Sequence, residues 1–205
     1  MSNPEVPSRP KKLDQILTTA EDLFQRFGFK RITIEEICEK ANVSKMTFYK
    51  YFSNKNELIK RIMNDWLDRV VKTFNEVELM NIPFTEKIRI LIRLKEETSS
   101  KFSKEFMLEY MNPDSDTQKI SKEFYERGIN IFIEIIKTSQ LKGEVRKDIK
   151  PEFLYVVLNK IVELAKDQEL VSLYPRISDF SMELNNFIYF GLLPFDALDN
   201  GNENN

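Results

Sequence analysis

Residues 33–52 read TIEEICEKANVSKMTFYKYF, and this stretch decides how the N-terminal part of the chain folds. Thr33 can cap a helix, and Glu36 three residues later can complete a capping box. Asn42 interrupts the apolar pattern and can adopt the positive φ of a tight turn. Ser44 can then cap a second short helix. Two short helices joined by such a turn indicate a helix-turn-helix.

The second of these helices interleaves aromatic rings with lysines. Phe48 and Phe52 are one turn apart and can both face the core. The side chains left on the outward face are Lys45, Thr47, Tyr49, Lys50 and Tyr51. Lysine neutralises phosphate, a tyrosine hydroxyl can bond a phosphate oxygen, and threonine suits a base edge. This face fits the major groove of DNA, although an ordinary helical hairpin with exposed rings would show the same spacing.

Helical periodicity extends through the rest of the chain. A first helix is expected from Pro10 to Gly28, and a long fourth helix is expected to begin at Lys55 and to continue past Trp66. Further helices are expected at 84–101, 103–111, 115–140, 151–173 and 176–192. The pattern predicts an all-α fold in which an N-terminal three-helix helix-turn-helix domain, residues 9–69, shares the fourth helix with a larger helical domain, residues 70–194. Residues 195–205 are polar and are expected to be disordered.

Composition argues against several classes of protein. Only five glycines are present and they are scattered, so a glycine loop that cradles phosphate is not expected. Histidine is absent and Cys38 is the only cysteine, which removes the usual general base and the usual metal ligands. We therefore expect no metal, no cofactor and no enzymatic activity. The longest apolar stretch, residues 187–193, is too short to span a bilayer, and the N-terminus lacks a secretory signal, so we expect a cytoplasmic protein without a membrane partner.

Charge is distributed unevenly along the chain. Residues 1–61 carry 12 Lys and Arg against 8 Asp and Glu, whereas the remaining residues carry 19 against 25. A basic N-terminal part joined to an acidic body suggests an electrostatic footprint for nucleic acid at one end only.

The basic part resembles a known family. Residues 11–64 are similar to the DNA-binding region of the TetR family of bacterial transcriptional regulators, through the motifs ILTTAEDLF (16–24), FGF (27–29), TIEEI (33–37), ANVSK (41–45), TFYKYF (47–52) and KNEL (55–58). The resemblance implies contacts with double-stranded operator DNA, among which Lys55 would hold a phosphate at the start of the fourth helix. Met46 and Lys50, which belong to the second helix of the helix-turn-helix, are added to the residues that the resemblance implies. The expected DNA-binding residues are Thr33, Ser44, Lys45, Met46, Thr47, Tyr49, Lys50, Tyr51 and Lys55.

Two positions depart from the family pattern. Asn42 stands where the family often has glycine, but asparagine can adopt the same backbone conformation. Lys50 stands where the family often has an aromatic residue, which changes what reaches the DNA. The operator sequence therefore does not follow from the resemblance.

The resemblance also implies that the larger domain binds a small effector and forms a homodimer. An aromatic-rich pocket would favour an apolar or aromatic effector, although any one of these rings more often belongs to an ordinary core. The expected pocket residues are Trp66, Phe102, Phe106, Met107, Tyr110, Phe124, Phe132 and Tyr155. The last two helices of each chain are expected to form a four-helix bundle in the dimer. Its expected interface residues are Phe153, Val157, Ile161, Leu164, Ile177, Phe180, Leu184, Phe187 and Ile188.

The sequence thus indicates a homodimeric, sequence-specific DNA-binding regulator, and in the simplest form a repressor that a small effector releases from its operator. Two alternatives stay open. One is an activator or partner-recruiting regulator without a small effector, and the other is a helical adaptor that has lost DNA binding. The adaptor would show no salt-dependent affinity for DNA, whereas the repressor would lose DNA affinity when its effector binds.

Overall fold

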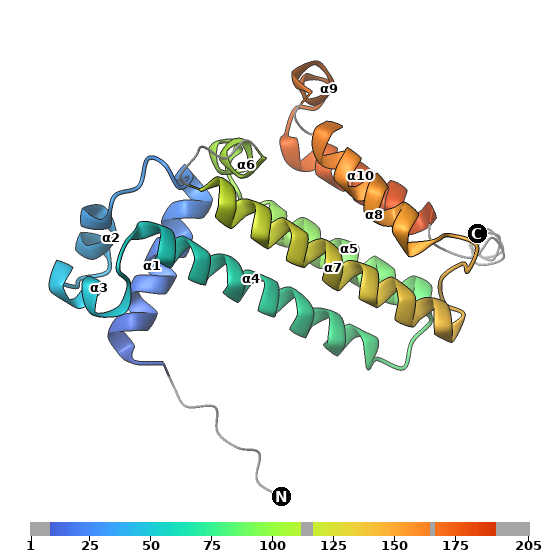
Figure 1. Cartoon of the computed structure of the whole chain (residues 1–205), viewed down its shortest axis with the longest axis horizontal. Coiled ribbons are helices and arrows are strands. Elements are labelled where there is room, and N and C mark those ends of the chain that lie inside the picture. Colours follow the sequence, from blue (N-terminus) through green and yellow to red (C-terminus); the bar gives the residue numbers. More distant parts are fainter. Residues whose placement is uncertain (1–8, 112–116, 165–166, 192–205) are drawn as a thin grey trace, which may run out of the picture.

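A computed structural model describes residues 9–111, 117–164 and 167–191 of the chain (Figure 1). Within these ranges the chain forms ten helices and no strand, so the predicted all-α fold is confirmed. The helices are α1 (Lys11–Phe27), α2 (Ile34–Lys40), α3 (Lys45–Tyr51), α4 (Lys55–Glu78), α5 (Phe84–Ser99), α6 (Lys104–Met111), α7 (Gln118–Lys142), α8 (Pro151–Leu164), α9 (Gln168–Ser172) and α10 (Ile177–Gly191). The tail that the sequence predicts to be disordered lies outside the described residues.

Helices α1, α2 and α3 pack with the first half of α4 around one apolar core. Phe24, Ile37, Phe48 and Leu58 contribute one fully buried side chain from each of these helices. Because α4 continues from this core into the rest of the molecule, the N-terminal domain and the body share one rigid element (Figure 1). The boundary predicted between residues 69 and 70 falls inside that helix.

Side-chain caps fix where the short helices begin. Thr33 Oγ1 accepts a hydrogen bond from the backbone N–H of Glu36 (3.2 Å), and α2 starts there. Ser44 Oγ accepts from the N–H of Thr47 (3.1 Å), and α3 starts there. Between the two helices Asn42 has a φ of 51°, which confirms the positive φ predicted for this turn. The helix-turn-helix geometry is therefore encoded within about a dozen residues.

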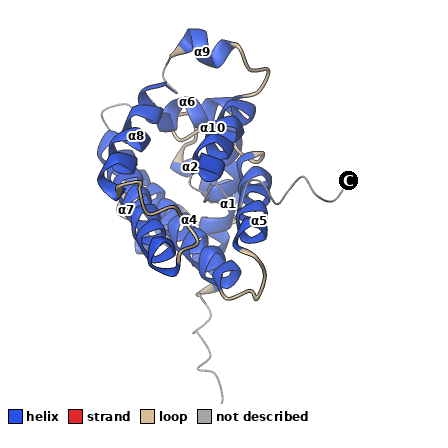
Figure 2. Cartoon of the chain, turned by 90° about the vertical axis from the view of Figure 1, so that its right-hand side faces the viewer, coloured by secondary structure: helices blue, strands red, loops and turns tan. Residues whose placement is uncertain are grey.

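The body is built around the rest of α4. Helices α5 and α7 both contact α4, while α8 packs on α7 and α10 packs on α5. Figures 1 and 2 show α8 and α10 as the layer farther from α4. A second apolar cluster joins α7 to α8, and its buried members are Ile129, Ile133, Ile136, Val145 and Leu154.

The sequence predicts one helix over residues 151–173, and this prediction is wrong. Helix α8 ends at Leu164, and α9 is a separate helix of five residues. Asp167 begins the new helix, since its Oδ1 accepts hydrogen bonds from the N–H groups of Glu169 (2.9 Å) and Leu170 (3.1 Å). The apolar spacing of residues 151–173 does not reveal this capping aspartate.

The turn geometry generates a test of stability. Asn42→Ala should lower the free energy of unfolding by about 1 kcal/mol, because alanine resists a positive φ. Asn42→Gly should change it by less than about 0.5 kcal/mol, because glycine adopts the same φ without a steric cost. Urea unfolding followed by circular dichroism measures both variants. Equal stability of the two would contradict the left-handed conformation at this position.

Candidate DNA-binding site

Helix α3 presents an exposed face at one end of the molecule (Figure 1). Met46 is 84% exposed and Tyr49 is 54% exposed, whereas Phe48 on the opposite face has no exposed surface. The exposed side chains on this helix are Lys45, Met46, Tyr49 and Lys50. A cationic, aromatic face thus stands on a helix whose other side is anchored in the core.

Four other residues predicted to bind DNA make contacts within the chain: Thr33, Ser44, Thr47 and Tyr51. Thr33 and Ser44 are exposed, and each uses its hydroxyl oxygen to cap a helix. The Oγ atoms of Ser44 and Thr47 also lie 2.9 Å apart and share a hydrogen bond. Tyr51 is half-buried and packs against the N-terminal core. The cap bonds fix the position of the first turn of α3.

Lys45 already has an ionic partner within the chain. Its ammonium lies 2.5 Å from Glu35 Oε1, and both side chains are exposed. The hydrogen bond raises the pKa of Lys45 and lowers the pKa of Glu35, and the attraction between their charges acts in the same directions. Both groups are therefore charged at neutral pH. A phosphate that approaches Lys45 would have to compete with Glu35.

Lys55 is held by backbone carbonyls instead of standing free. Its ammonium donates to the carbonyl oxygens of Phe29 (3.0 Å) and Ile32 (3.0 Å), with that of Lys30 at 3.5 Å. The side chain is half-buried. Lys55 therefore positions the turn between α1 and α2, and the phosphate contact expected from the sequence would be made by a lysine that also has this role.

Five of the residues predicted for an effector pocket form one continuous set of ring contacts. Trp66 lies edge-on to Phe102, with 5.4 Å between ring centroids, and Phe102 stacks on Phe106 at 4.5 Å. Tyr110 continues the row beside Phe106 at 6.1 Å, and Phe124 follows at 5.9 Å. Burial raises the pKa of the Tyr110 phenol above its usual range, so this group stays neutral. The set joins α4, α6 and α7.

Two of the other three pocket candidates lie away from these rings. Met107 packs against the same apolar cluster as the rings, whereas Phe132 packs against the second cluster. Tyr155 is exposed on α8. The predicted pocket residues thus belong to separate regions of the body.

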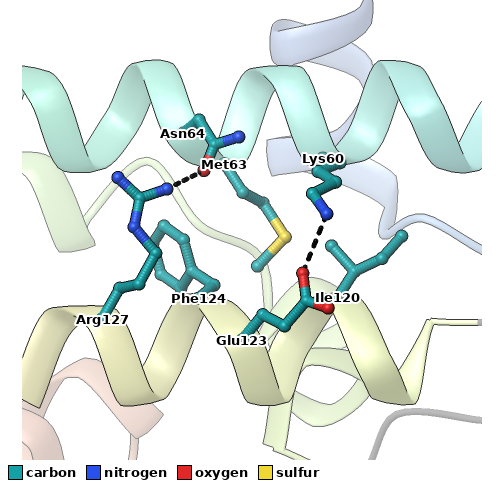
Figure 3. A pocket seen from close by; sticks show the side chains of 7 residues that line it. All are labelled: Lys60, Met63, Asn64, Ile120, Glu123, Phe124 and Arg127. Atoms are coloured by element: carbon teal, nitrogen blue, oxygen red, sulfur yellow. Dashed lines mark hydrogen bonds and ion pairs between the residues drawn. The ribbon is translucent and has the colours of Figure 1, made fainter.

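A cavity of about 200 Å³ lies between α4 and α7, next to the N-terminal domain (Figure 3). Its lining residues are Lys60, Met63, Asn64, Ile120, Glu123, Phe124 and Arg127. Two polar contacts cross it: Lys60 Nζ lies 2.9 Å from Glu123 Oε2, and Arg127 donates to the Asn64 side-chain oxygen. Only Phe124 was predicted to line a pocket. The crossing pairs are 63 residues apart in sequence, so no local pattern could have revealed them.

Trp66 also links the body to the N-terminal domain. Its indole Nε1–H donates to Glu21 Oε1 on α1 at 2.8 Å. The same oxygen accepts from Arg69 at 2.6 Å. Because Trp66 contacts Phe102 on its other side, it lies at the junction between the two parts.

The residues predicted at a dimer interface differ in their exposure. Phe153, Leu164 and Phe187 are exposed, the last to 77%. Val157, Ile161 and Leu184 are half-buried. Val156 of α8, which is not among the predicted interface residues, is exposed as well. Exposed apolar side chains thus lie on both α8 and α10.

Two residues of the predicted interface face into their own chain. Phe180 is only 4% exposed, and its ring centroid lies 5.2 Å from that of Tyr174. Ile188 packs against the second apolar cluster. The side chain of Ile177 lies outside what the structure describes. Phe180 and Ile188 can add little to a seam with a partner.

Two further findings concern the described part of the chain. No group of three or more Cys, Asp or Glu side chains there is arranged to hold a metal ion. No helix in those ranges combines the length and the apolar character needed to cross a bilayer.

A capped helix-turn-helix with an exposed cationic helix, mounted on a long helix that enters a helical body, defines a DNA-binding protein with an attached all-helical domain. Comparison with known proteins agrees with this class. Residues 16–62 match the family described as bacterial regulatory proteins, tetR family. The HTH-type transcriptional regulator YhgD of Bacillus subtilis is 30% identical over 147 residues, which cover 68% of this chain and 69% of that protein.

A second Bacillus subtilis regulator, YdgC, is 23% identical over 187 residues, which cover 88% of this chain and 92% of that protein. A crystal structure of a TetR-family regulator from Syntrophomonas wolfei has the same fold, with a TM-score of 0.65 and 19% identity over 90% of this chain and 98% of that one. The chain belongs to the TetR family of DNA-binding transcriptional regulators.

The pair between Lys45 and Glu35 leads to a prediction about DNA affinity. Glu35→Gln removes a negative charge beside the exposed face of α3 and frees Lys45 for phosphate. It should therefore tighten binding to any DNA sequence roughly two- to tenfold at about 0.1 M salt, and the gain should shrink as salt rises. Fluorescence anisotropy titrations at several salt concentrations measure this. Glu97→Gln, at an exposed position on α5, is the matched control and should leave the DNA affinity unchanged at every salt concentration.

Proposed function

We propose that the protein is a homodimeric repressor that leaves its operator when a small apolar or aromatic molecule binds to its body. The proposal is supported chiefly by the exposed cationic face of α3, which stands at the end of a helix bundle that continues into the body through α4. Within this proposal Lys45, Lys50, Tyr49, Tyr51 and Lys55 contact phosphates, while Met46 and Thr47 approach base edges. Thr33 and Ser44 hold the ends of their helices against the DNA backbone.

The exposed apolar surface of α8 and α10 supports the dimer. Two copies of this surface can form an isologous four-helix bundle, which would place two α3 helices on one side of the dimer. A twofold dimer reads two half-sites about one DNA turn, roughly 34 Å, apart. A small change in the separation of the two α3 helices would then prevent the dimer from binding both half-sites at once.

The effector would act on this separation. Helix α4 carries α3 at its start and contacts α5 and α7 farther along, so a molecule that shifts these contacts would swing the start of α4. The ring set from Trp66 to Phe124 supports an apolar or aromatic ligand, and Met63, Ile120 and Phe124 give the adjacent cavity an apolar side. Such a ligand need only bind the wrongly spaced dimer better than the competent one.

Selection of DNA from a random library by the purified protein tests the proposal directly. A repressor of this kind should enrich a sequence with twofold symmetry, and some compounds should lower its affinity for that sequence. Enrichment of no sequence, together with no salt-dependent DNA affinity, would leave the helical adaptor as the better explanation. If the protein enriches an operator but no compound lowers its affinity for that sequence, a regulator without a small effector becomes the better explanation.

Thr47 provides a sharper test of sequence reading. Thr47→Ala should weaken binding to the selected operator by about 1 to 3 kcal/mol and relax the preference at one or two base pairs of each half-site. Binding to random DNA should hardly change, because phosphate contacts remain. Titrations on both DNAs measure the difference, and Thr18→Ala on the exposed face of α1 is the control. An equal loss on both DNAs would remove Thr47 from the reading set.

The dimer interface is tested at Phe187. Phe187→Glu places a charge on the exposed apolar surface of α10, where a partner would bury it without a counter-ion. We expect the dissociation constant of the dimer to rise by roughly 100-fold or more. Sedimentation velocity across a concentration series measures this. Leu141→Glu, at an 85% exposed position near the end of α7, should leave the dimer intact, and equal dissociation by both variants would argue against this interface.

A further inference from the structure

The turn between α1 and α2, residues 28–33, is gripped by charged side chains from two other helices. Glu109 of α6 accepts hydrogen bonds at Oε2 from the N–H groups of Phe29 (2.5 Å) and Lys30 (2.9 Å). From the opposite side Lys55 of α4 donates to the carbonyl oxygens of Phe29 and Ile32, both at 3.0 Å. A turn of the DNA-binding domain is thus held partly by an acid that belongs to the body.

One peptide group takes part in both contacts. The peptide that joins Phe29 to Lys30 donates its N–H to Glu109 and accepts from Lys55 at its C=O. Its dipole therefore lies between a carboxylate and an ammonium, and each charged hydrogen bond strengthens the other. Such bonds are directional, so they fix the orientation of the turn as well as its position.

Gly28 makes this approach of the carboxylate possible. A Cβ atom at this position would lie 2.8 Å from Cδ and from both oxygens of Glu109. Gly28 also has a φ of 79°, which favours glycine. The sequence explains Gly28 as the residue that ends α1, and the structure adds that only a residue without a side chain admits Glu109 here.

Helix α6 is docked on the same region by two further contacts. The N–H of Ser103, just before α6, donates to the carbonyl oxygen of Gln25 near the end of α1 (2.8 Å). The ring of Phe106 lies edge-on to that of Phe29, with 5.1 Å between centroids. On its other side Phe106 touches Trp66, and Tyr110 of the same helix touches Phe124 of the body. A shift of α6 relative to α4 and α7 would therefore carry Glu109 with it.

We propose that Glu109 is a positioning residue, which sets the orientation of α3 relative to the body through the peptide between Phe29 and Lys30. Helix α2 begins directly after this turn, and α3 packs against both α2 and α1, the two helices that the turn joins. The turn therefore contributes to the direction in which α3 points. The body then communicates with the recognition helix through α6 as well as through α4. The consequence for DNA binding rests on the proposed function, in which α3 reads an operator.

The orientation is measured without DNA. Spin labels at Met46→Cys on α3 and Leu141→Cys on α7, with the buried Cys38 replaced by alanine, report the distance from the recognition helix to the body. Both labelled positions are more than 80% exposed, and dilution with unlabelled protein suppresses distances between protomers. Glu109→Ala should broaden this distance distribution. Glu109→Gln, whose amide oxygen can still accept, should broaden it less, and Glu105→Ala, an exposed acid on the same helix, should leave it unchanged.

An unchanged distribution in Glu109→Ala would overturn the proposal, as would equal broadening in Glu105→Ala. If Glu109→Ala does not fold, as judged by circular dichroism, then Glu109→Gln carries the same test with the same expected direction.

DNA binding provides the second measurement. Glu109→Ala should bind the operator selected by the wild-type protein roughly tenfold more weakly, because each protomer of the dimer loses the charged hydrogen bonds of Glu109. Its affinity for random DNA should stay within about twofold of wild type. Glu109→Gln should recover part of the loss. Wild-type affinity of Glu109→Ala for the operator would overturn the positioning role. If the wild-type protein selects no operator, the proposed function fails, and the distance measurement still decides the role of Glu109.

Discussion

The burial of the Phe48 ring is the constraint on which the DNA-facing surface depends. A helix of seven residues is not stable on its own, because nucleating a helix is costly and few hydrogen bonds repay it. Helix α3 exists because Phe48 has no exposed surface and belongs to the core that α1, α2 and α4 share. Loss of that ring would cost about 3 to 5 kcal/mol, which is a large part of the stability of a typical domain. The lysines and tyrosines on the outer face are held in register by the ring on the inner face.

Stability and orientation come from different interactions at the junction with the body. The apolar core extends across it, since Phe106 of α6 packs with residues of α1 and α4. Apolar contacts tolerate sliding, whereas hydrogen bonds do not. Directional contacts also cross the junction, among them the bonds of Glu21 to Trp66, of Glu109 to the α1–α2 turn, and of Lys60 to Glu123. The N-terminal domain can therefore change its orientation relative to the body while the apolar core across the junction stays packed.

Local signals made the helix-turn-helix predictable from sequence. The caps at Thr33 and Ser44 and the turn at Asn42 act over three or four residues, so the neighbouring sequence is enough to predict them. The grip of Glu109 joins residues about 80 positions apart, and no periodicity encodes it. Apolar spacing also did not distinguish two positions on one face of α10: Phe187 is exposed, but Phe180, two turns earlier in the same predicted stripe, is buried within its own chain. The predicted pocket rings divided in the same way, because a pattern of apolar residues does not say which neighbour each one meets.

Trp66 is the only tryptophan in the chain, and its position gives the molecule an internal optical probe. Indole emission responds to the polarity around the ring and to the hydrogen bond at its nitrogen, and both depend here on contacts that cross the junction. Unmodified protein can thus be mixed with a chemical library, and a change in emission colour or intensity identifies compounds that disturb this boundary. Neither the operator nor the regulated gene has to be known before such a screen begins.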